Sequence, residues 1–183
     1  MSVLLTEKRF QFRILTMALR RWTVDANSAW SPQVTQRALA IMRAAGEHVA
    51  VIEQPFPVTF KSELKQHGAL AADAQIWRDV KADCGSAGVD VYADESVCTA
   101  DDVDLLAPYV HGVNVKMDKA GGFRGALRAL HAAKQLGLKT WVGMMVGSKL
   151  ASTAASHLLP LAVAADLDGA PLVTDESQAL FEV

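Results

Sequence analysis

The sequence has no long hydrophobic run and almost no net charge, and each absence excludes a class of protein. Its longest uninterrupted apolar stretch, residues 158–165, holds eight residues, whereas a helix that crosses a membrane needs about 20. Glu7 and Lys8 interrupt the first residues before the apolar core of a secretion signal could form. With 20 acidic and 18 basic side chains, the formal charge is −2, which provides no field to attract nucleic acid or anionic lipid. We therefore expect neither a membrane segment nor a nucleic-acid partner.

Cysteine is scarce as well. The sequence contains Cys84 and Cys98, which are 14 residues apart and form neither a Cys-x-x-Cys pair nor a repeated disulfide framework. Because disulfides are typical of oxidising compartments, this pattern favours reduced thiols in a cytoplasmic protein. The 183 residues, of which 51% are apolar, are enough for a single globular domain.

Short β-branched runs alternate with helical stretches from about residue 22 onward, which is typical of βαβ units and a parallel sheet. Six strands are predicted, and they end at Asp25, Glu53, Asp94, Lys116, Gly143 and Asp166. The interval from Glu53 to Asp94 is 41 residues, whereas one strand, its returning helix and two loops need roughly 30. The sequence therefore predicts an inserted hairpin or helix in this interval, beside a helix at about residues 72–84.

Repeated βα units close most simply as a (β/α)₈ TIM-type barrel, but a complete barrel takes about 250 residues. We therefore predict an α/β fold in which residues 1–183 form one partial barrel domain. Residues 8–14 alternate in the manner of a half-exposed strand. Seven residues separate them from Trp22, which leaves no room for a crossover helix. Residues 1–20 are accordingly interpreted as an atypical N-terminal segment before the regular units.

Charged residues end four consecutive predicted strands: Asp25, Glu53, Asp94 and then Lys116. The carboxyl ends of parallel strands share one rim, and that rim carries the ligands in barrels of this type. A single acidic strand end is more often a loop residue or a salt-bridge partner. Three neighbouring carboxylates, however, repel one another unless a cation neutralises them. Oxygen ligands without histidine or cysteine favour a hard ion, and Mg²⁺ with retained waters suits them better than Zn²⁺.

Lys116 is the candidate acid–base residue. A divalent cation nearby disfavours the charged ammonium, which would shift the lysine pKa toward a value useful for a general base. The metal would hold a substrate carboxylate and stabilise the charge that develops as the neighbouring α-proton leaves. The alternative is a salt bridge from Lys116 to Asp94 or Asp118, which would be preferred without a metal.

The sequence resembles a known family over roughly residues 22–173. Four motifs carry the resemblance: Asp25-Ala26-Asn27-Ser28-Ala29-Trp30, Glu53-Gln54-Pro55, Ala93-Asp94-Glu95-Ser96 and the run from Asn114-Val115-Lys116 to Gly121-Gly122. They are similar to the successive barrel motifs of the enolase superfamily, and more narrowly of its muconate-lactonizing-enzyme subgroup. The resemblance implies that Asp25, Glu53 and Asp94 bind Mg²⁺. It also implies that Lys116 is one of two acid–base lysines that face opposite sides of the substrate α-carbon.

The segment Asp166-Leu167-Asp168-Gly169 resembles the Asp-x-Asp element with which dipeptide epimerases of this subgroup hold the substrate ammonium group. Two carboxylates at a rim complement a cationic amine, although a turn built on aspartate and glycine fits the spacing equally well. The leading hypothesis is thus a Mg²⁺-dependent isomerase that acts on a small-molecule carboxylate, most similar to an Ala-Glu-type dipeptide epimerase. A muconate cycloisomerase or an o-succinylbenzoate-synthase-like enzyme is the second hypothesis.

Parts of the family pattern are not found in this sequence. We expect the first barrel strands, with their Lys-x-Lys motif, and the α+β capping domain to be absent, and we expect the last barrel strand to begin near Pro171-Leu172-Val173. Missing strands would leave sheet edges open to association. A catalytically silent barrel fragment that binds metal or forms a homo-oligomer is therefore the third hypothesis.

Overall fold

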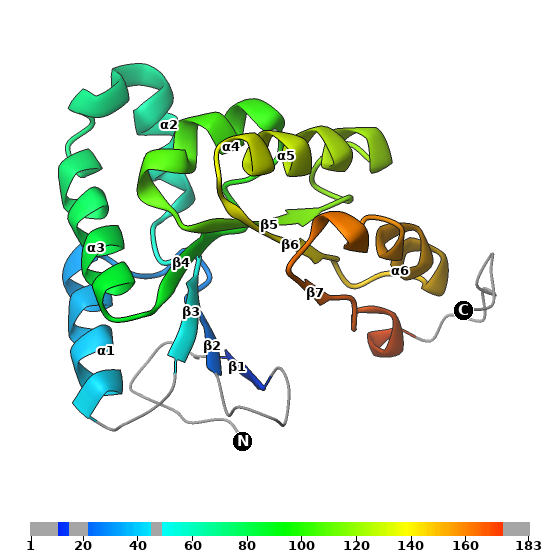
Figure 1. The fold of residues 1–183 in the computed structure, drawn as a ribbon, viewed down its shortest axis with the longest axis horizontal. Coiled ribbons are helices and arrows are strands. Elements are labelled where there is room, and N and C mark those ends of the chain that lie inside the picture. The colour runs from blue at the N-terminus through cyan, green and yellow to red at the C-terminus, as the bar shows by residue number, and fades with distance from the viewer. Residues whose placement is uncertain (1–10, 15–21, 45–48, 174–183) are drawn as a thin grey trace. The chain divides into compact units, whose positions relative to one another are not determined.

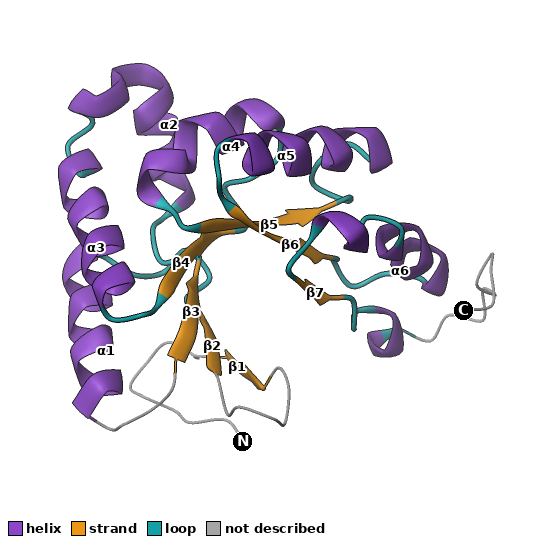
Figure 2. Cartoon of the chain, viewed as in Figure 1, coloured by secondary structure: helices purple, strands orange, loops and turns teal. Residues whose placement is uncertain are grey.

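The computed structural model describes residues 11–14, 22–44 and 49–173 of the chain (Figure 1). Contacts divide the chain into two compact units. The first comprises residues 1–96 and 108–111, and the second comprises residues 97–107 and 112–183. Figure 2 shows the helices, strands and loops of the described residues. Residues 8–10 of the alternating segment 8–14 lie outside the described residues.

The described residues of the first unit form four strands and three α-helices. Its elements are β1 (Gln11–Ile14), β2 (Trp22–Asp25), α1 (Pro32–Ala44), β3 (Val49–Glu53), α2 (Val58–His67), the 3₁₀ turn Gly68–Leu70, α3 (Ala74–Ser86) and β4 (Asp90–Ala93). The strands lie in the order in which they occur in the chain. Strand β1 runs antiparallel to β2, and the pairs β2–β3 and β3–β4 are parallel.

The second unit has the same alternation. Its elements are α4 (Ala100–Leu106), β5 (Gly112–Lys116), α5 (Phe123–Gln135), β6 (Lys139–Gly143), α6 (Lys149–Ser156), the 3₁₀ turn Leu159–Leu161, β7 (Ala164–Asp166) and the 3₁₀ turn Ala170–Leu172. A further 3₁₀ turn, Ala107–Tyr109, follows α4 in the chain. Strand β6 lies between β5 and β7 and is parallel to both.

The six strands predicted from the sequence are confirmed as β2 to β7, and each ends within one residue of the predicted position. The oversized interval between β3 and β4 holds the helix α2 in addition to α3, so the inserted element is a helix and not a hairpin. The last predicted strand begins near residues 171–173, and its continuation from residue 174 onward lies outside the described residues. Residues Ala170–Leu172 form a 3₁₀ turn, whose first turn tolerates Pro171 because proline has no N–H to leave unpaired.

Side chains alternate between the two faces of each strand, and this alternation forms the core of the first unit. Val24, Ile52 and Val91, from three adjacent strands, are at most 1% exposed and lie on the face opposite Glu53. An aromatic cluster packs where α2 and α3 meet the end of β3. Its members are Phe56, Phe60, Trp77 and Tyr109.

The second unit packs α5 against β5 and β6 through small residues. Val113, Val115 and Val142 on the strands are at most 1% exposed. The helix contributes a buried stripe of residues at helical spacing: Ala126, Ala129, Leu130 and Ala133. Small side chains let the helix approach the sheet closely. No helix within the described ranges is both long and apolar enough to cross a membrane.

Candidate metal and acid–base site

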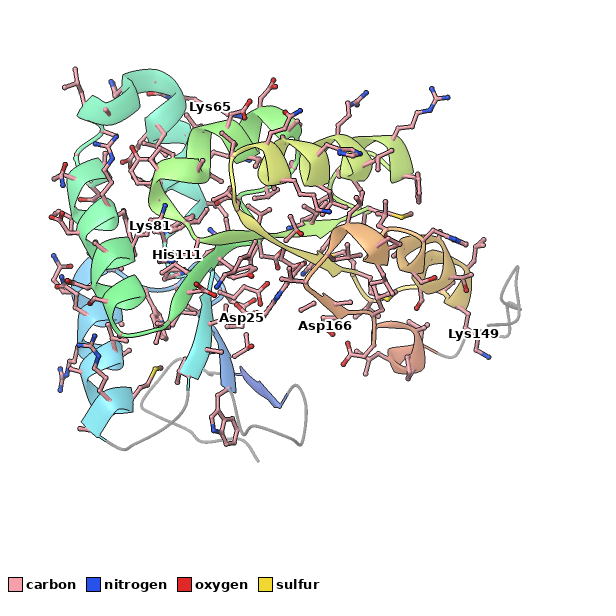
Figure 3. All side chains as sticks on the ribbon, viewed as in Figure 1. Asp25, Lys65, Lys81, His111, Lys149 and Asp166 are labelled. Carbon is pink, nitrogen blue, oxygen red and sulfur yellow. The ribbon has the colours of Figure 1, made fainter. Side chains whose placement is uncertain are left out.

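Three carboxylate residues follow one another along the strand ends of the first unit. Asp25 lies directly opposite Glu53 in the parallel pair β2–β3, and Glu53 lies opposite Tyr92 in the pair β3–β4. Neighbouring strands are about 4.8 Å apart, and residues in register place their side chains on the same face. Asp94 is two residues beyond Tyr92, so continued alternation returns it to that face. Figure 3 labels Asp25, the first of the three.

Two of these carboxylates are deeply buried. Glu53 is 7% exposed and Asp94 is 4% exposed, whereas Asp25 is half-buried. Burial raises the pKa of the Tyr92 hydroxyl well above its ordinary value, and the negative charges of Asp90 and Glu53 raise it further. Tyr92 thus lies on a strand face that is shielded from solvent and carries the negative charges of Asp90 and Glu53. Such a face disfavours further anions and favours a bound cation.

The donor set suits a hard divalent ion, because it consists of carboxylate oxygens on adjacent strand ends. Within residues 11–14, 22–44 and 49–173, however, no three His, Cys, Asp or Glu side chains lie close enough together to hold a metal ion. The backbone therefore places the three carboxylates on one face without gathering their oxygens at a common point. A bound cation would have to draw these side chains together against their mutual repulsion.

The loop that follows Asp25 is hydrogen-bonded to the segment that carries Glu53. The N–H of Ala26 donates to the carbonyl of Glu53 at 2.9 Å, and the N–H of Ser28 donates to the carbonyl of Gln54 at 2.8 Å. The N–H of Asn27 donates to Oδ1 of Asp25 at 2.8 Å. Asn27 has a φ of 45° and Ser28 has a φ of 61°, so this loop adopts a left-handed backbone conformation that few residues other than glycine and asparagine favour.

Lys116 ends β5 in the second unit, opposite Gly143 of β6. A Cβ atom at position 143 would lie 3.1 Å from Cε of Lys116 and 2.6 Å from Oδ1 of Asn114. The lysine stem and the buried asparagine amide therefore occupy the space above a residue that has no side chain. Gly143 in turn lies opposite Asp166 of β7, so Lys116, Gly143 and Asp166 form one row across three strands.

Asp166 is half-buried at the end of β7, whereas Asp168 is exposed in the turn that follows. The turn is held against the loop after β6, because a Cβ atom at Gly169 would lie 2.6 Å from the carbonyl oxygen of Met145. The hydroxyl of Ser152 also donates to the carbonyl of Leu167 at 3.3 Å. The structure thus contains the turn that the spacing allowed: Asp166 ends the strand before this turn, and Asp168 lies within it.

The alternative role for Lys116 was a salt bridge to Asp94 or Asp118. Oδ2 of Asp118 accepts the N–H of Met145 at 3.1 Å, which ties this carboxylate to the loop after β6. The predicted site residues are divided between the units. Asp25, Glu53 and Asp94 belong to the first, and Lys116, Asp166 and Asp168 belong to the second.

Sequence reasoning missed the contributions of two residues. Gly143 was treated only as a strand end, although its lack of a side chain makes room for Lys116. Gln54 was treated only as part of a motif, although it is fully buried and its side chain makes four hydrogen bonds. The one available signal for Gln54 was the placement of a long polar side chain between a strand end and a proline.

Comparison with known proteins identifies the family. Residues 11–178 match the family described as Enolase C-terminal domain-like, and the chain belongs to this family of the enolase superfamily. It is 40% identical over 179 residues to an enolase superfamily member of Dictyostelium discoideum, which covers 96% of this chain and 41% of the relative. It is 34% identical over 160 residues to the L-Ala-D/L-amino acid epimerase of Pedosphaera parvula, with coverages of 87% and 42%.

A solved structure supports the same assignment. The substrate-liganded L-Ala-D/L-Glu epimerase of Bacillus subtilis aligns with a TM-score of 0.69 and 25% identity, over 84% of this chain and 40% of that protein. The predicted fold class, an incomplete (β/α)₈ TIM-type barrel, is confirmed by this likeness together with the parallel, sequential strands. The chain spans about two fifths of the length of the relatives that it matches.

Proposed function

We propose that this chain supplies the metal-binding residues and one acid–base lysine of a Mg²⁺-dependent epimerase that acts on dipeptides of the Ala-Glu type. The observation that carries the proposal is the sequence of charged strand ends, in which Asp25 and Glu53 lie in register and Lys116 ends β5. The epimerases among the relatives support the reaction class.

Asp25, Glu53 and Asp94 would hold the metal in this proposal. Enolase superfamily members typically use Mg²⁺, and three carboxylates suit a hard ion that retains part of its water shell. When bound, the ion would hold a substrate carboxylate and stabilise the charge that develops on it. The burial of Glu53 and Asp94 excludes water from part of this face, which strengthens electrostatic interactions there.

Lys116 would perform the proton transfer. Its neutral amine would take the proton from the carbon next to the substrate carboxylate, and the resulting ammonium would return a proton to the same carbon. A base that removes and returns a proton on one face exchanges it with solvent without inverting the centre. Epimerisation requires, in addition, a second group that delivers a proton from the opposite face. Exchange in D₂O therefore measures the contribution of Lys116 by itself.

A metal-binding experiment tests the first part of the proposal. We expect Glu53→Gln to weaken Mg²⁺ binding at least about tenfold, because a neutral amide loses the charge that attracts the ion. A given Mg²⁺ concentration should then raise the melting temperature of the wild-type protein by more than that of the variant. Titration calorimetry and thermal unfolding provide the measurements. Glu63→Gln makes the same substitution on α2 and is the control, for which we expect the wild-type Mg²⁺ affinity and melting temperature. Equal Mg²⁺ affinity in the wild-type protein, Glu53→Gln and Glu63→Gln would refute the site.

Asp168→Asn tests the substrate class. Charge-assisted hydrogen bonds contribute about 1.5–3 kcal/mol, so the variant should slow α-proton exchange of L-Ala-L-Glu about 10- to 100-fold. Exchange of a carboxylate that lacks the ammonium group, such as N-acetyl-L-Ala-L-Glu or a muconolactone, should not change. Proton NMR in D₂O follows both reactions. An equal loss for both substrates would assign Asp168 a structural role, and lactone formation without dipeptide exchange would favour the cycloisomerase alternative.

A further inference from the structure

Gln54 is a buried polar residue that follows the proposed metal ligand Glu53. Its side chain is 0% exposed. Its Oε1 accepts the N–H of Asp94 at 2.8 Å and the N–H of Ser96 at 3.3 Å. Its Nε2 donates to the carbonyl of Phe56 at 2.9 Å and to Oγ of Ser96 at 2.8 Å. An amide has two acceptor sites and two donors, and here all four are used.

The backbone of Gln54 makes two more connections. Its N–H donates to the carbonyl of Tyr92 at 2.7 Å, and its carbonyl accepts the N–H of Ser28 at 2.8 Å. The φ of Gln54 is 37°, in the left-handed region that costs non-glycine residues free energy unless the surroundings stabilise it. The six hydrogen bonds supply that stabilisation, and left-handed backbone at a residue beside a binding site is a common form of local strain.

We propose that Gln54 is a positioning residue that sets the separation of the three proposed metal ligands. It bonds to the loop after Asp25 through Ser28, it is covalently linked to Glu53, and it accepts the backbone N–H of Asp94 itself. This inference rests on the proposed metal site. It adds that one buried residue links all three ligand-bearing loops: its backbone carbonyl holds the loop after Asp25, and its side-chain amide holds the loop at Asp94. A cation then need only turn the side chains and need not order the backbone.

The physical reason for such a residue is electrostatic repulsion. Three carboxylates on one face repel one another, and this repulsion favours separation of the loops that carry them. Hydrogen bonds from the loops to a common, uncharged group oppose that separation without adding charge. Partners of this kind around metal ligands typically change metal affinity 10- to 100-fold when they are removed.

The experiment measures Mg²⁺ affinity and metal-free stability together. Gln54→Met keeps the length of the side chain but removes its hydrogen bonds, and we expect it to weaken Mg²⁺ binding about 10- to 100-fold. Ser96→Ala removes a single bond to Nε2 and is the milder variant, for which we expect a severalfold loss. Calorimetric titration well below the melting temperature of each variant separates affinity from folding. Amide hydrogen exchange at Asp94 should accelerate in Gln54→Met with or without Mg²⁺.

Val80→Ala provides the matched control, because Val80 is 1% exposed on α3 and its truncation destabilises the same unit without touching the ligand loops. We expect this variant to lose stability and to keep its Mg²⁺ affinity. If Gln54→Met and Ser96→Ala bind Mg²⁺ as tightly as Val80→Ala does, the positioning role is overturned while the metal site stands. If the wild-type protein binds no Mg²⁺, the metal site and the positioning role are both overturned.

Discussion

Replacement of Lys116 by alanine is expected to slow exchange of the substrate α-proton by about 10²- to 10⁴-fold, the range that a general base typically contributes. The amine is the only group of this side chain that can accept the proton, and alanine leaves nothing in its place. Lys116→Arg should be almost as inactive, because the guanidinium stays protonated at any pH that the protein tolerates. Time-resolved proton NMR in D₂O with L-Ala-L-Glu measures the rate.

Lys134→Ala is the matched control for this experiment. Lys134 lies on the exposed side of α5 in the same unit, so the substitution removes the same charge without touching the rim. We expect it to exchange the proton at the wild-type rate. Circular dichroism of all the variants checks that they are folded. Exchange that persists unchanged in Lys116→Ala would remove Lys116 from the proposed role and would require another base.

The second large effect concerns stability. Phe60→Ala should lower the free energy of unfolding by about 3–5 kcal/mol, as is typical of a buried aromatic side chain truncated to alanine. Phe60 is 2% exposed. Its ring centroid lies 5.5 Å from that of Phe56, 6.2 Å from that of Trp77 and 5.1 Å from that of Tyr109. The cavity would open in the middle of this cluster, where three rings cannot all move to fill it.

Urea denaturation monitored by tryptophan fluorescence measures this loss, and Trp77 within the cluster provides the local signal. Leu70→Ala is the control, because Leu70 is 91% exposed, and substitutions at such positions usually change stability by less than about 0.5 kcal/mol. A loss below about 1 kcal/mol for Phe60→Ala would mean that the cluster collapses around the cavity or is loosely packed.

The strands were predictable because their signal is local. β-branched runs that end in a charged residue identified β2, β3 and β5, and the spacing between strand ends showed that the interval before β4 holds an extra element. The antiparallel pairing of β1 with β2 was not predicted, although the short connection already excluded the crossover helix that a parallel pair needs. The 3₁₀ turn at Ala170–Leu172 was missed because apolar residues after proline fit a strand equally well.

The site was predictable in part. Because the carboxyl ends of parallel strands share one rim, the sequence predicted that Asp25 and Glu53 lie at the same edge of the sheet. The bonds of Gln54 were not predictable, because its partners Asp94 and Ser96 lie 40 and 42 residues away in the chain. The space that Gly143 leaves for Lys116 was not predictable either, because it depends on the register between β5 and β6, which the sequence does not specify. Pairings across the sheet, and not propensities along the chain, position these side chains.

The empty position at Gly143 has an evolutionary consequence. A methyl group there would contact both Asn114 and Lys116, so the three positions cannot vary independently. Among homologous sequences, an alanine or serine at position 143 should co-occur with a residue smaller than asparagine at position 114. Where a homologue has a larger residue at position 143 and still has asparagine at position 114, we expect a residue other than lysine at position 116. Such a homologue would lack the proposed proton transfer.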